Sequence, residues 1–367
     1  MMRLLIAGGG TGGHLFPGVA VAEALRARHP DADVLFVGTE RGIEARVLDK
    51  LGWPLATIDI SGIKTVGPWG AVRGALRIPR ALWQSRRIIR SFRPDAILGV
   101  GGYASGPAVL AGWLSRVPVA VLEQNSIPGL TNKILGKIAR AVFIAFDETR
   151  RFFAPKRVVM TGTPIRAALR ARLTDGGRDG AAERDPDRPL RLFAFGGSQG
   201  AIAINELVVD AVAELRRRGR EVAVVHQTGE RDLERTRRRY ADAGVHADCR
   251  AFIDDMAAQY AWADLVVARA GAATVAELAV AGVPAILIPL PTAADNHQEI
   301  NARELAARGA ALMLRQTTLD GRRLADAIAA LMDDPAALER MRSGMKALGR
   351  PDAADRIVDW IEHVSQG

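Results

Sequence analysis

The chain has 367 residues, more than a single hydrophobic core usually spans, so its length predicts two domains. Hydrophobic residues make up 49% of the sequence, which indicates sizeable cores, and no apolar run is long enough to span a membrane. The net charge of +9 favours an anionic membrane face, a phosphorylated substrate or a nucleic acid as partner, and the single cysteine excludes an internal disulfide bond. We expect a cytoplasmic protein that is neither exported nor membrane-spanning.

The first predicted elements are a short buried strand over residues 3–7 and a helix over residues 19–26. A glycine-rich turn at residues 8–13 joins them and ends at His14. Glycine lets a ligand approach the backbone closely, and the start of a helix adds partial positive charge. The turn therefore predicts a phosphate site.

Two interpretations of this turn remain open from the residues alone. Gly8, Gly10 and Gly13 match the dinucleotide pattern GxGxxG, with Glu40 as the acid that would bind ribose. A P-loop is excluded, because no Lys-Ser/Thr pair closes the turn. His14 would stand at the mouth of the turn as a site residue, or it would merely cap the helix.

A basic stretch follows between Asp59 and Asp95, where the sequence has no acidic residue and many arginines. Apolar residues recur there at helical spacing beside a face of arginines, which is typical of a helix on a membrane surface. A surface helix whose apolar stripe faces the core is the other interpretation. The expected membrane contacts are Trp69, Arg73, Leu76, Arg77, Arg80 and Trp83. No nucleic-acid-binding module is found, so nucleic acid is not an expected partner.

Strands and helices continue to alternate through the first half. Buried strands are predicted over residues 96–100, 117–122, 141–146 and 158–161. A second glycine-rich turn, residues 101–107, precedes a helix over residues 108–115, and a polar turn contains Glu123, Gln124 and Asn125. Alternating strands and helices predict a parallel sheet, whose sites gather at the carboxyl ends of the strands. We therefore expect these turns to line one cleft.

A polar stretch at residues 174–189 separates the two halves and predicts a flexible loop or linker without a chemical role. The pattern then restarts with a strand, a glycine-rich turn, a helix and a strand over residues 190–195, 196–200, 203–217 and 221–225. Two doubly wound domains, each with a glycine-rich turn after its first strand, predict a deep cleft between them.

The second half carries residues typical of a nucleotide site. Arg269 and Gly271 follow a strand over residues 265–268 and precede a helix that carries Glu277. An arginine beside a helix N-terminus suits a diphosphate, and a glutamate one turn into that helix suits ribose hydroxyls. For Glu277 alone, a solvated acid that complements the helix dipole remains the other interpretation.

Nine short motifs are spread over nearly the whole chain. In chain order they are GGGTGGH, GVGGYASGP, EQNSIPGLTNK, GTPIR, FGGSQGA, HQTG, FIDDMAAQYAWADLVVARAG, TVAEL and NHQEINA. Together they resemble the MurG family, the UDP-N-acetylglucosamine:N-acetylmuramyl-(pentapeptide) pyrophosphoryl-undecaprenol N-acetylglucosamine transferases of peptidoglycan synthesis.

The resemblance implies an α/β protein with two doubly wound Rossmann-like domains facing a deep cleft, the glycosyltransferase B-type fold. Residues 1–163 would bind the acceptor and the membrane, and residues 164–342 would bind the UDP-sugar. Residues 343–367, with a last helix around residues 352–364, would pack back on the N-terminal domain. Family members use no metal and no other cofactor, so helix N-termini and cationic side chains would stabilise the leaving UDP.

The resemblance also implies which residues bind the donor. They are Arg166, Ser198, Ile253, Arg269, Thr274, Glu277, His297 and Gln298. Ile253 would hold uracil through its backbone and Glu277 would hold ribose, while Arg269 with Ser198 would contact the diphosphate. The last two residues of the set would contact the sugar or a phosphate.

On the acceptor side, the resemblance implies His14 as general base. Around it would lie Thr11, Gly12, Gly13, Tyr103 and Asn125. The imidazole would take the proton from the acceptor's C4 hydroxyl, which attacks the anomeric carbon with inversion as UDP leaves, forming a β-1,4 link. The turns at residues 8–13 and 101–106 would take the acceptor's pyrophosphate.

The sequence departs from the family's pattern at Leu122, where many relatives have a histidine, and at Ala270, where many have a serine. Neither departure threatens the class. Other functions remain open: another transferase of this fold, a UDP-sugar epimerase, a nicotinamide-dependent oxidoreductase, or a non-catalytic membrane-docked binding protein. The expected partners are UDP-N-acetylglucosamine, the undecaprenyl-pyrophosphoryl-N-acetylmuramyl-pentapeptide acceptor, an anionic membrane surface at the cytoplasmic face of the bacterial inner membrane, and cell-wall and division proteins.

Overall fold

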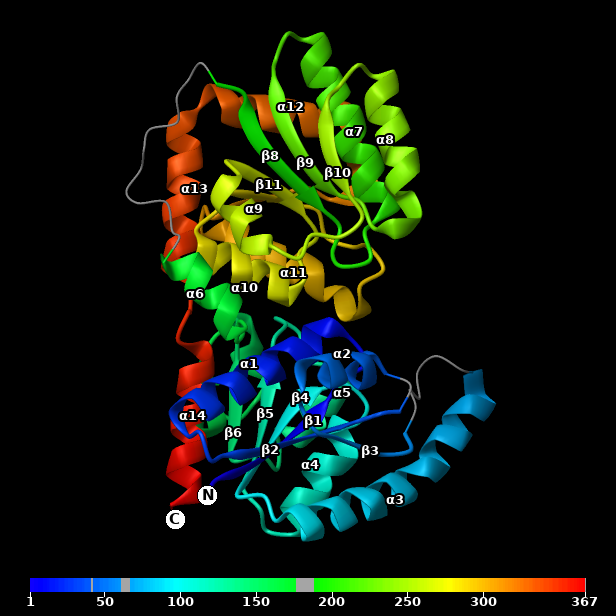
Figure 1. Ribbon diagram of the computed structural model, residues 1–367, viewed down its shortest axis with the longest axis vertical. Coiled ribbons are helices and arrows are strands. Elements are labelled where there is room, and N and C mark those ends of the chain that lie inside the picture. Colours follow the sequence, from blue (N-terminus) through cyan, green and yellow to red (C-terminus); the bar gives the residue numbers. More distant parts are fainter. Residues whose placement is uncertain (41, 61–66, 176–187, 367) are drawn as a thin grey trace. The chain divides into compact units, whose positions relative to one another are not determined.

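The computed structural model describes residues 1–40, 42–60, 67–175 and 188–366, without the side chains of residues 43, 67–77 and 175. Two compact units make up the chain (Figure 1). The first contains Met1–Ala167 and Arg350–Gly367, and the second contains Ala168–Gly349. Each unit has its own parallel sheet and its own hydrophobic core.

The first unit is built on a parallel sheet. In the described part of the chain it has seven strands, in the order β3-β2-β1-β4-β5-β6-β7. Their bounds are β1 (Arg3–Gly8), β2 (Asp33–Gly38), β3 (Leu55–Thr57), β4 (Ala96–Gly101), β5 (Val119–Glu123), β6 (Ala141–Ile144) and β7 (Val158–Met160). The strand order reverses between β1 and β4, so their carboxyl ends flank the switch point at which open α/β sheets bind ligands.

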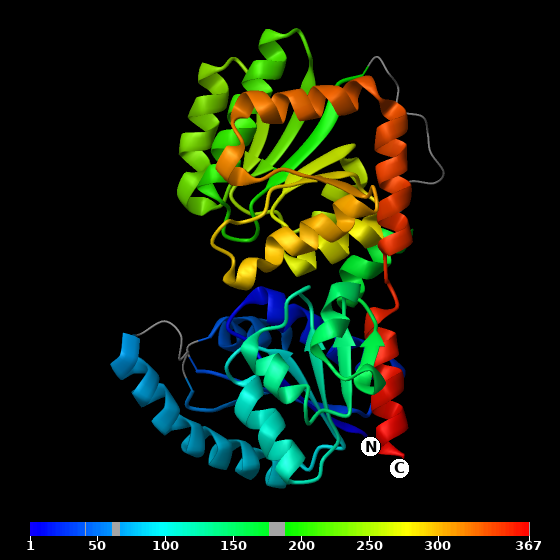
Figure 2. The ribbon, with the colours of Figure 1, turned by 180° about the vertical axis from the view of Figure 1, so that it is seen from behind.

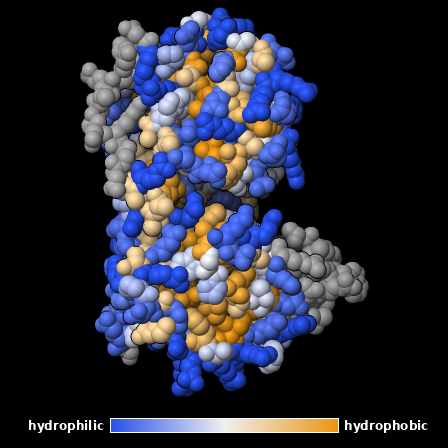
Figure 3. All heavy atoms as spheres, in the orientation of Figure 1, coloured by the Kyte–Doolittle hydropathy of each residue, from blue (hydrophilic) through white to orange (hydrophobic). Residues whose placement is uncertain are grey.

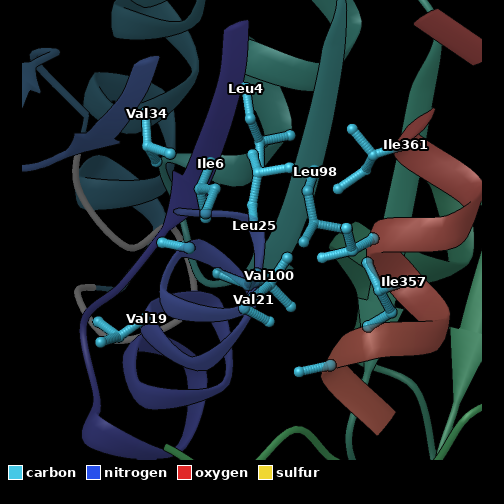
Figure 4. Close-up of a cluster of buried hydrophobic side chains, with 14 of the residues drawn as sticks. Leu4, Ile6, Val19, Val21, Leu25, Val34, Leu98, Val100, Ile357 and Ile361 are labelled. Carbon is cyan, nitrogen blue, oxygen red and sulfur yellow. The ribbon is translucent and has the colours of Figure 1, made fainter. Parts of the chain in front are cut away.

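Helices cover both faces of this sheet. They are α1 (Gly12–Arg28), α2 (Ile43–Leu51), α3 (Gly67–Phe92), α4 (Ser105–Leu114), α5 (Leu130–Leu135) and α14 (Ala353–Ser365). Alternate residues of β1 enter two cores, because side chains alternate between the faces of a strand. Leu4 and Ile6 meet side chains of α1 and α14, as Figure 4 shows, whereas Leu5 belongs to the core under α4. Strands buried on both faces read as continuous apolar runs, and this made them predictable.

The last helix, α14, packs on the first unit. Ile357 and Ile361 are fully buried in the same core as β1 (Figure 4). The ring of Trp360 lies edge-on to that of Phe143, with centroids 5.6 Å apart. At the end of the helix, Glu362 contacts His29 Nε2 at 2.7 Å. Apolar burial and this polar contact together fix α14 against α1.

The second unit repeats the architecture. Its parallel sheet has six strands in the described part, in the order β10-β9-β8-β11-β12-β13. Their bounds are β8 (Leu190–Phe195), β9 (Val222–Gln227), β10 (Ala247–Arg250), β11 (Leu265–Ala268), β12 (Ala285–Leu287) and β13 (Ala311–Met313). The order reverses between β8 and β11, which gives this sheet a switch point of its own.

The helices of the second unit complete its layers. They are α6 (Ala167–Asp175), α7 (Ile202–Arg217), α8 (Leu233–Asp242), α9 (Met256–Trp262), α10 (Ala272–Ala281), α11 (His297–Ala307), α12 (Gly321–Asp333) and α13 (Pro335–Leu348). Figure 2 shows α12 lying over one face of the sheet, where Leu324 and Ile328 join the core. Asp320 caps α12 by accepting a hydrogen bond of 2.8 Å from the Arg323 N–H, which fixes where the helix begins.

The apolar stripe of α3 faces the core. Ala81 and Ile89 are buried, and Leu82 and Phe92 pack against the same cluster, so the interpretation as a core-facing surface helix holds for this part of the stripe, whereas Ile78 is 37% exposed. Trp83 is different, because it is 63% exposed. The side chains of four other expected membrane contacts lie outside the described part: Trp69, Arg73, Leu76 and Arg77. Among the described residues, no helix combines the length and apolarity that crossing a membrane requires.

Two arginines of α8 form ion pairs with acidic side chains, so the surface of this helix is less basic than its sequence indicates. Arg239 lies 2.6 Å from Asp210 on α7, and Arg237 lies 2.8 Å from Glu234. Figure 3 shows the hydrophilic surface over this helix. Such exposed pairs contribute little stability, but they reduce the positive charge of this face.

Two expectations about the bounds of elements need correction. Helix α1 begins at Gly12 instead of residue 19, because glycines and the internal Pro17 hide its first turns in the sequence. The predicted loop at residues 174–189 is too long at both ends. Thr174 is still part of α6, and Arg188 makes a bidentate ion pair with the buried Asp264 at 2.6 and 2.8 Å. Residues 176–187 lie outside the described part.

The two units end a few residues from the predicted domain limits. The first extends to Ala167, whose N–H donates to Glu23 Oε2 at 2.7 Å and so ties the segment to α1. Residues 343–349 belong to the second unit, because they complete α13 and Met345 is buried there.

Candidate functional site

The glycine turns after β1 and β4 lie in backbone contact. The N–H of Gly9 donates to the carbonyl of Gly101 at 3.2 Å. Gly102 has a φ of +81°, and a Cβ there would lie 2.3 Å from the carbonyl oxygen of Gly9. The turns therefore need glycine to approach this closely. Their contact forms the switch point of the first sheet.

His14 lies on this contact, in the first turn of α1. Its ring packs over Gly101, where a Cβ would lie 2.8 Å from Cδ2 and 3.0 Å from Nε2. Its Nδ1 lies 3.2 Å from Thr11 Oγ1. When the hydroxyl oxygen accepts from Nδ1–H, Nε2 is the nitrogen that takes up a proton. In that tautomer His14 presents Nε2 as its proton-accepting atom, as a general base requires.

Glu44 on α2 supports the turn, and sequence reasoning missed it. Its carboxylate, 1% exposed, accepts hydrogen bonds from the N–H of Gly10 at 2.9 Å and from the N–H and hydroxyl of Thr39, both at 2.8 Å. Burial alone would raise the pKa of Glu44, but these hydrogen bonds outweigh it and leave the pKa below its ordinary value. A buried anion therefore orders the tip of the turn.

Asn125 is positioned at the carboxyl end of β5. The buried Glu123 accepts from the Asn125 N–H at 3.0 Å and from Asn132 Nδ2 at 2.9 Å. Burial raises the pKa of Glu123 above its usual range. Thr149 donates to the Asn125 carbonyl at 3.1 Å, and Gln124 Nε2 donates to the carbonyl of Val100 on β4 at 3.0 Å. These bonds fix Asn125 beside the end of β4.

The acceptor-side residues predicted from sequence therefore lie at neighbouring strand ends of one unit. Thr11, Gly12, Gly13 and His14 follow β1, Tyr103 follows β4, and Asn125 follows β5. Tyr103 is 46% exposed, and Thr11 and Gly13 are also exposed. A substrate can therefore reach this group of side chains.

A pocket of about 650 Å³ adjoins this group in the same unit. Its walls include Thr39, Glu40, Asp59, Arg80, Gln84 and Tyr103. Arg80, an expected membrane contact, pairs here with Asp59 at 3.4 Å. Glu40, considered above as a ribose acid, is an exposed part of the wall.

In the second unit, the glycine turn after β8 packs on the turn after β9. Gly200 has a φ of +72°, and a Cβ there would lie 1.9 Å from the carbonyl oxygen of Thr228. Ser198 is exposed on this turn. Beneath it, His226 Nε2 lies 3.1 Å from Asn205 Oδ1, and burial lowers the pKa of His226 to about 3. This histidine is neutral and structural, a role its motif did not reveal.

Gln227 links the turn to Ile253, and sequence reasoning missed this residue too. Its Nε2 donates to the Gly197 carbonyl at 3.0 Å, and its Oε1 accepts from the Ile253 N–H at 2.8 Å. The N–H of Ile253 is therefore already bonded inside the unit. In this conformation, the carbonyl is the backbone group of Ile253 that would contact a base, because the N–H already donates to Gln227.

The guanidinium of Arg269 is fixed by two backbone carbonyls. Arg269 is 7% exposed, and its Nη1 donates to the carbonyls of Ile288 and Pro289 at 3.0 and 3.1 Å. Burial lowers the pKa of Arg269. Gly271, two residues later, is the N-cap of α10, so a fixed positive charge lies beside a helix N-terminus.

Glu277 and Thr274 lie on α10. Glu277 Oε2 accepts a hydrogen bond of 2.8 Å from the hydroxyl of Tyr260, and burial raises the pKa of Tyr260 well above its usual value. Thr274 Oγ1 would lie 3.9 Å from a Cβ at Gly271. The hydrogen bond from Tyr260 on α9 therefore orients Glu277. An acid that only complements the helix dipole would not be held in this way.

His297 and Gln298 begin α11. Nδ1 of His297 donates to the carbonyl of Ala294 at 2.7 Å, and Gln298 Oε1 accepts from the N–H of Leu290 at 3.0 Å. On the same helix, Asn301 Nδ2 donates to the Ala270 carbonyl at 3.1 Å, tying α11 to the Arg269 turn. No trio of His, Cys, Asp or Glu side chains placed to hold a metal is present in the part of the chain that the structure describes.

The predicted donor residues separate into two groups. All but one follow strands of the second sheet: Ser198, Ile253, Arg269, Thr274, Glu277, His297 and Gln298. Arg166 belongs to the first unit, where its guanidinium lies 4.9 Å from the ring centroid of Phe16 on α1.

Both units of the chain are similar to known proteins. The N-terminal domain model of glycosyltransferase family 28 matches residues 4–144, and its C-terminal domain model matches residues 191–357. A UDP-N-acetylglucosamine–N-acetylmuramyl-(pentapeptide) pyrophosphoryl-undecaprenol N-acetylglucosamine transferase of Anaeromyxobacter sp. is 50% identical over 98% of this chain and 92% of its own length. The protein of that name from Myxococcus xanthus is 48% identical over the same shares. The crystal structure of Acinetobacter baumannii MurG has a TM-score of 0.82 and 34% identity, covering 99% of this chain and all of that one.

Proposed function

The chain belongs to glycosyltransferase family 28 and within it to the MurG family, and we propose on this basis how its residues perform the family's reaction. Its two units are the Rossmann-like domains of the B-type glycosyltransferase fold. The enzyme transfers N-acetylglucosamine from UDP-N-acetylglucosamine to the C4 hydroxyl of N-acetylmuramyl-pentapeptide on undecaprenyl pyrophosphate, in peptidoglycan synthesis. The deep cleft that the sequence predicts between the two domains remains untested.

The placement of His14 carries the proposal for the chemistry. It sits where two strand ends meet, with its ring fixed over Gly101 and its Nδ1 beside Thr11. Nε2 accepts the proton of the C4 hydroxyl as the oxygen attacks the anomeric carbon, and UDP leaves from the opposite face. The sugar inverts and gains a β-1,4 link. Because this chain has Leu122 where many relatives have a histidine, His14 is the imidazole that we assign to this step.

The acceptor's pyrophosphate is assigned to the two glycine turns of the first unit. Backbone N–H groups at the start of α1 favour an anion there. Glu44 already takes up the N–H of Gly10, and the Gly101 carbonyl takes up that of Gly9, so the N–H groups assigned to the pyrophosphate are those at the start of α1.

The donor is assigned to the strand ends of the second unit. The N-terminus of α10 and the buried Arg269 attract the diphosphate, and Ser198 supplies a hydroxyl from the other glycine turn. Since Arg269 is already bonded to two backbone carbonyls, its charge is preorganised and needs no rearrangement when UDP leaves. Glu277, oriented by Tyr260, accepts from the ribose hydroxyls.

Membrane contact is proposed for the first unit. Trp83 is 63% exposed beside Arg87, whose guanidinium lies 6.0 Å from the ring centroid. On the neighbouring α4, Trp113 is 47% and Leu114 is 49% exposed. Aromatic and apolar side chains beside arginines suit an anionic membrane face, and the substrate is lipid-linked, so we assign the protein to the cytoplasmic face of the inner membrane. Contacts with cell-wall and division proteins stay a prediction.

The test is UDP release from UDP-N-acetylglucosamine, in EDTA, with and without the lipid-linked acceptor. Acceptor-dependent release together with a disaccharide-bearing lipid product supports the transferase. UDP release without acceptor points instead to an epimerase or hydrolase. A bound nicotinamide cofactor, visible by absorbance, would indicate an oxidoreductase.

A further inference from the structure

The pocket of about 650 Å³ in the first unit has no role in the reaction as derived above. It opens at the carboxyl ends of β2 and β3, where Thr39, Glu40 and Asp59 lie, and α3 contributes Arg80 and Gln84. Its volume falls in the range of small-molecule sites, roughly 300–1,000 Å³. The position is that of a ligand site, because it lies at the ends of strands next to a switch point.

The pocket shares its walls with the site around His14. Tyr103 lines it and directly follows Gly101 and Gly102, which carry the ring of His14 and the contact between the two turns. Thr39 lines it from the other side and donates twice to Glu44, whose carboxylate also accepts from Gly10. A molecule whose reactive group lies at His14 therefore has this pocket beside it.

The groups in the pocket are unsuited to a diphosphate. Among the lining residues that the structure describes, two carboxylates, Glu40 and Asp59, face one arginine, Arg80, which already lies 3.4 Å from Asp59. Gln84 accepts the Asp59 N–H through Oε1 at 2.8 Å, and the other end of its amide is a donor. Acceptors, an amide and one cation together match a ligand with several N–H groups and a carboxylate, which describes a short peptide.

The acceptor carries such a peptide next to the reacting atom. In an N-acetylmuramyl-peptide the stem hangs from the lactyl ether on O3, and the neighbouring carbon bears the C4 hydroxyl that attacks. When that hydroxyl lies at Nε2 of His14, the stem begins one carbon away from it, in the unit that holds the pocket lined by Tyr103.

We propose that this pocket binds the peptide stem of the acceptor. Glu40 and Asp59 accept from the stem's N–H groups and from a side-chain ammonium, and Arg80 binds a stem carboxylate. The assignment rests on the proposed function. It makes the pocket the element that distinguishes acceptors with a stem from acceptors without one.

Kinetics with two acceptors provide the first test. One acceptor is the lipid-linked N-acetylmuramyl-pentapeptide, and the other has the same lipid and sugar without the peptide. In Glu40→Gln we expect KM for the complete acceptor to rise about five- to tenfold, the loss of one charged hydrogen bond, with KM for the stemless acceptor and for UDP-N-acetylglucosamine unchanged. Asp31→Asn is the matched control, because Asp31 is exposed near the opposite end of β2. If Glu40→Gln shifts both acceptors equally or shifts neither, the stem does not bind here.

Direct binding separates this proposal from the proposed function. Soluble N-acetylmuramyl-pentapeptide and N-acetylmuramic acid are titrated into the full-length protein and followed by calorimetry. The proposal expects the pentapeptide to bind more tightly than the sugar alone, and the difference to shrink in Glu40→Gln but not in Asp31→Asn. Equal binding of the two ligands, or a difference that survives in Glu40→Gln, overturns it. If neither acceptor supports UDP release, the proposed function fails, and this titration still decides whether the pocket binds a stem.

Discussion

Glu44 accepts a hydrogen bond of 2.9 Å from the backbone N–H of Gly10, so a buried carboxylate on α2 holds the tip of the turn that precedes His14. The same carboxylate accepts from the N–H and hydroxyl of Thr39. The turn that carries the proposed base is therefore ordered by a residue that need not touch substrate.

Glu44→Ala should destabilise the first unit. The substitution leaves the N–H groups of Gly10 and Thr39 without their buried acceptor, at an expected loss of about 3 kcal/mol. Chemical denaturation followed by circular dichroism measures it. Asp49→Asn, an exposed acid on the same helix, is the control and should stay within about 0.5 kcal/mol of wild type. Equal stability of Glu44→Ala and wild type would show that the contact does not order the turn.

Two glycines of the acceptor turns should respond differently to alanine. Gly102 and Gly10 have φ values of +81° and +83°, so both substitutions strain the backbone alike. A Cβ at Gly102 would lie 2.3 Å from the Gly9 carbonyl oxygen, whereas one at Gly10 meets no described atom within 4 Å. Gly102→Ala should therefore lower the melting temperature clearly more than Gly10→Ala. Matching decreases would mean that backbone strain alone, and not the contact between the turns, sets the requirement.

Gln227→Ala should weaken donor binding and leave acceptor binding alone. Without the amide, the Gly197 turn and the Ile253 segment lose the side chain that joins them, so we expect KM for UDP-N-acetylglucosamine to rise about tenfold. Gln199→Ala on the exposed part of the turn is the comparison variant. An unchanged KM for UDP-N-acetylglucosamine in Gln227→Ala would show that the Gln227 amide stabilises the fold but does not position the donor site.

His226 predicts a pH dependence of stability. Its pKa is about 3 in the folded chain against 6.5 in the unfolded chain, because burial disfavours the charged ring. The unfolded state therefore binds an extra proton below pH 6.5, and stability falls from there towards pH 3 with a slope of up to about 1.4 kcal/mol per pH unit. His226→Gln should flatten this part of the pH profile, and His246→Gln, exposed in the same unit, should not. Parallel profiles for wild type and His226→Gln would exclude the buried histidine as the cause.

The strands and the glycine turns could be predicted from the sequence because both signals are local. A strand buried on both faces reads as an apolar run, and β4 is such a strand. Helix starts were less visible, since Gly12 and Gly13 carry no apolar pattern although they begin α1. Short strands such as β3 and β13 give too few residues for a periodicity.

The supporting residues of the site could not be predicted in this way. Gln227 joins two segments that lie 30 and 26 residues away, and Glu44 bonds a turn 34 residues before it. In the sequence, Glu44 reads as an acid that complements the dipole of its own helix. Such roles depend on which strand ends the fold brings together, and this is a property of the tertiary structure.

The most direct test of the central claim compares His14→Ala with His363→Ala, an exposed histidine on α14 of the same unit, in acceptor-dependent UDP release. If His14 is the base, kcat in His14→Ala falls by roughly two orders of magnitude or more while the melting temperature and donor KM stay near those of wild type, and His363→Ala is unaffected. Full turnover in His14→Ala would contradict the account and place the base elsewhere.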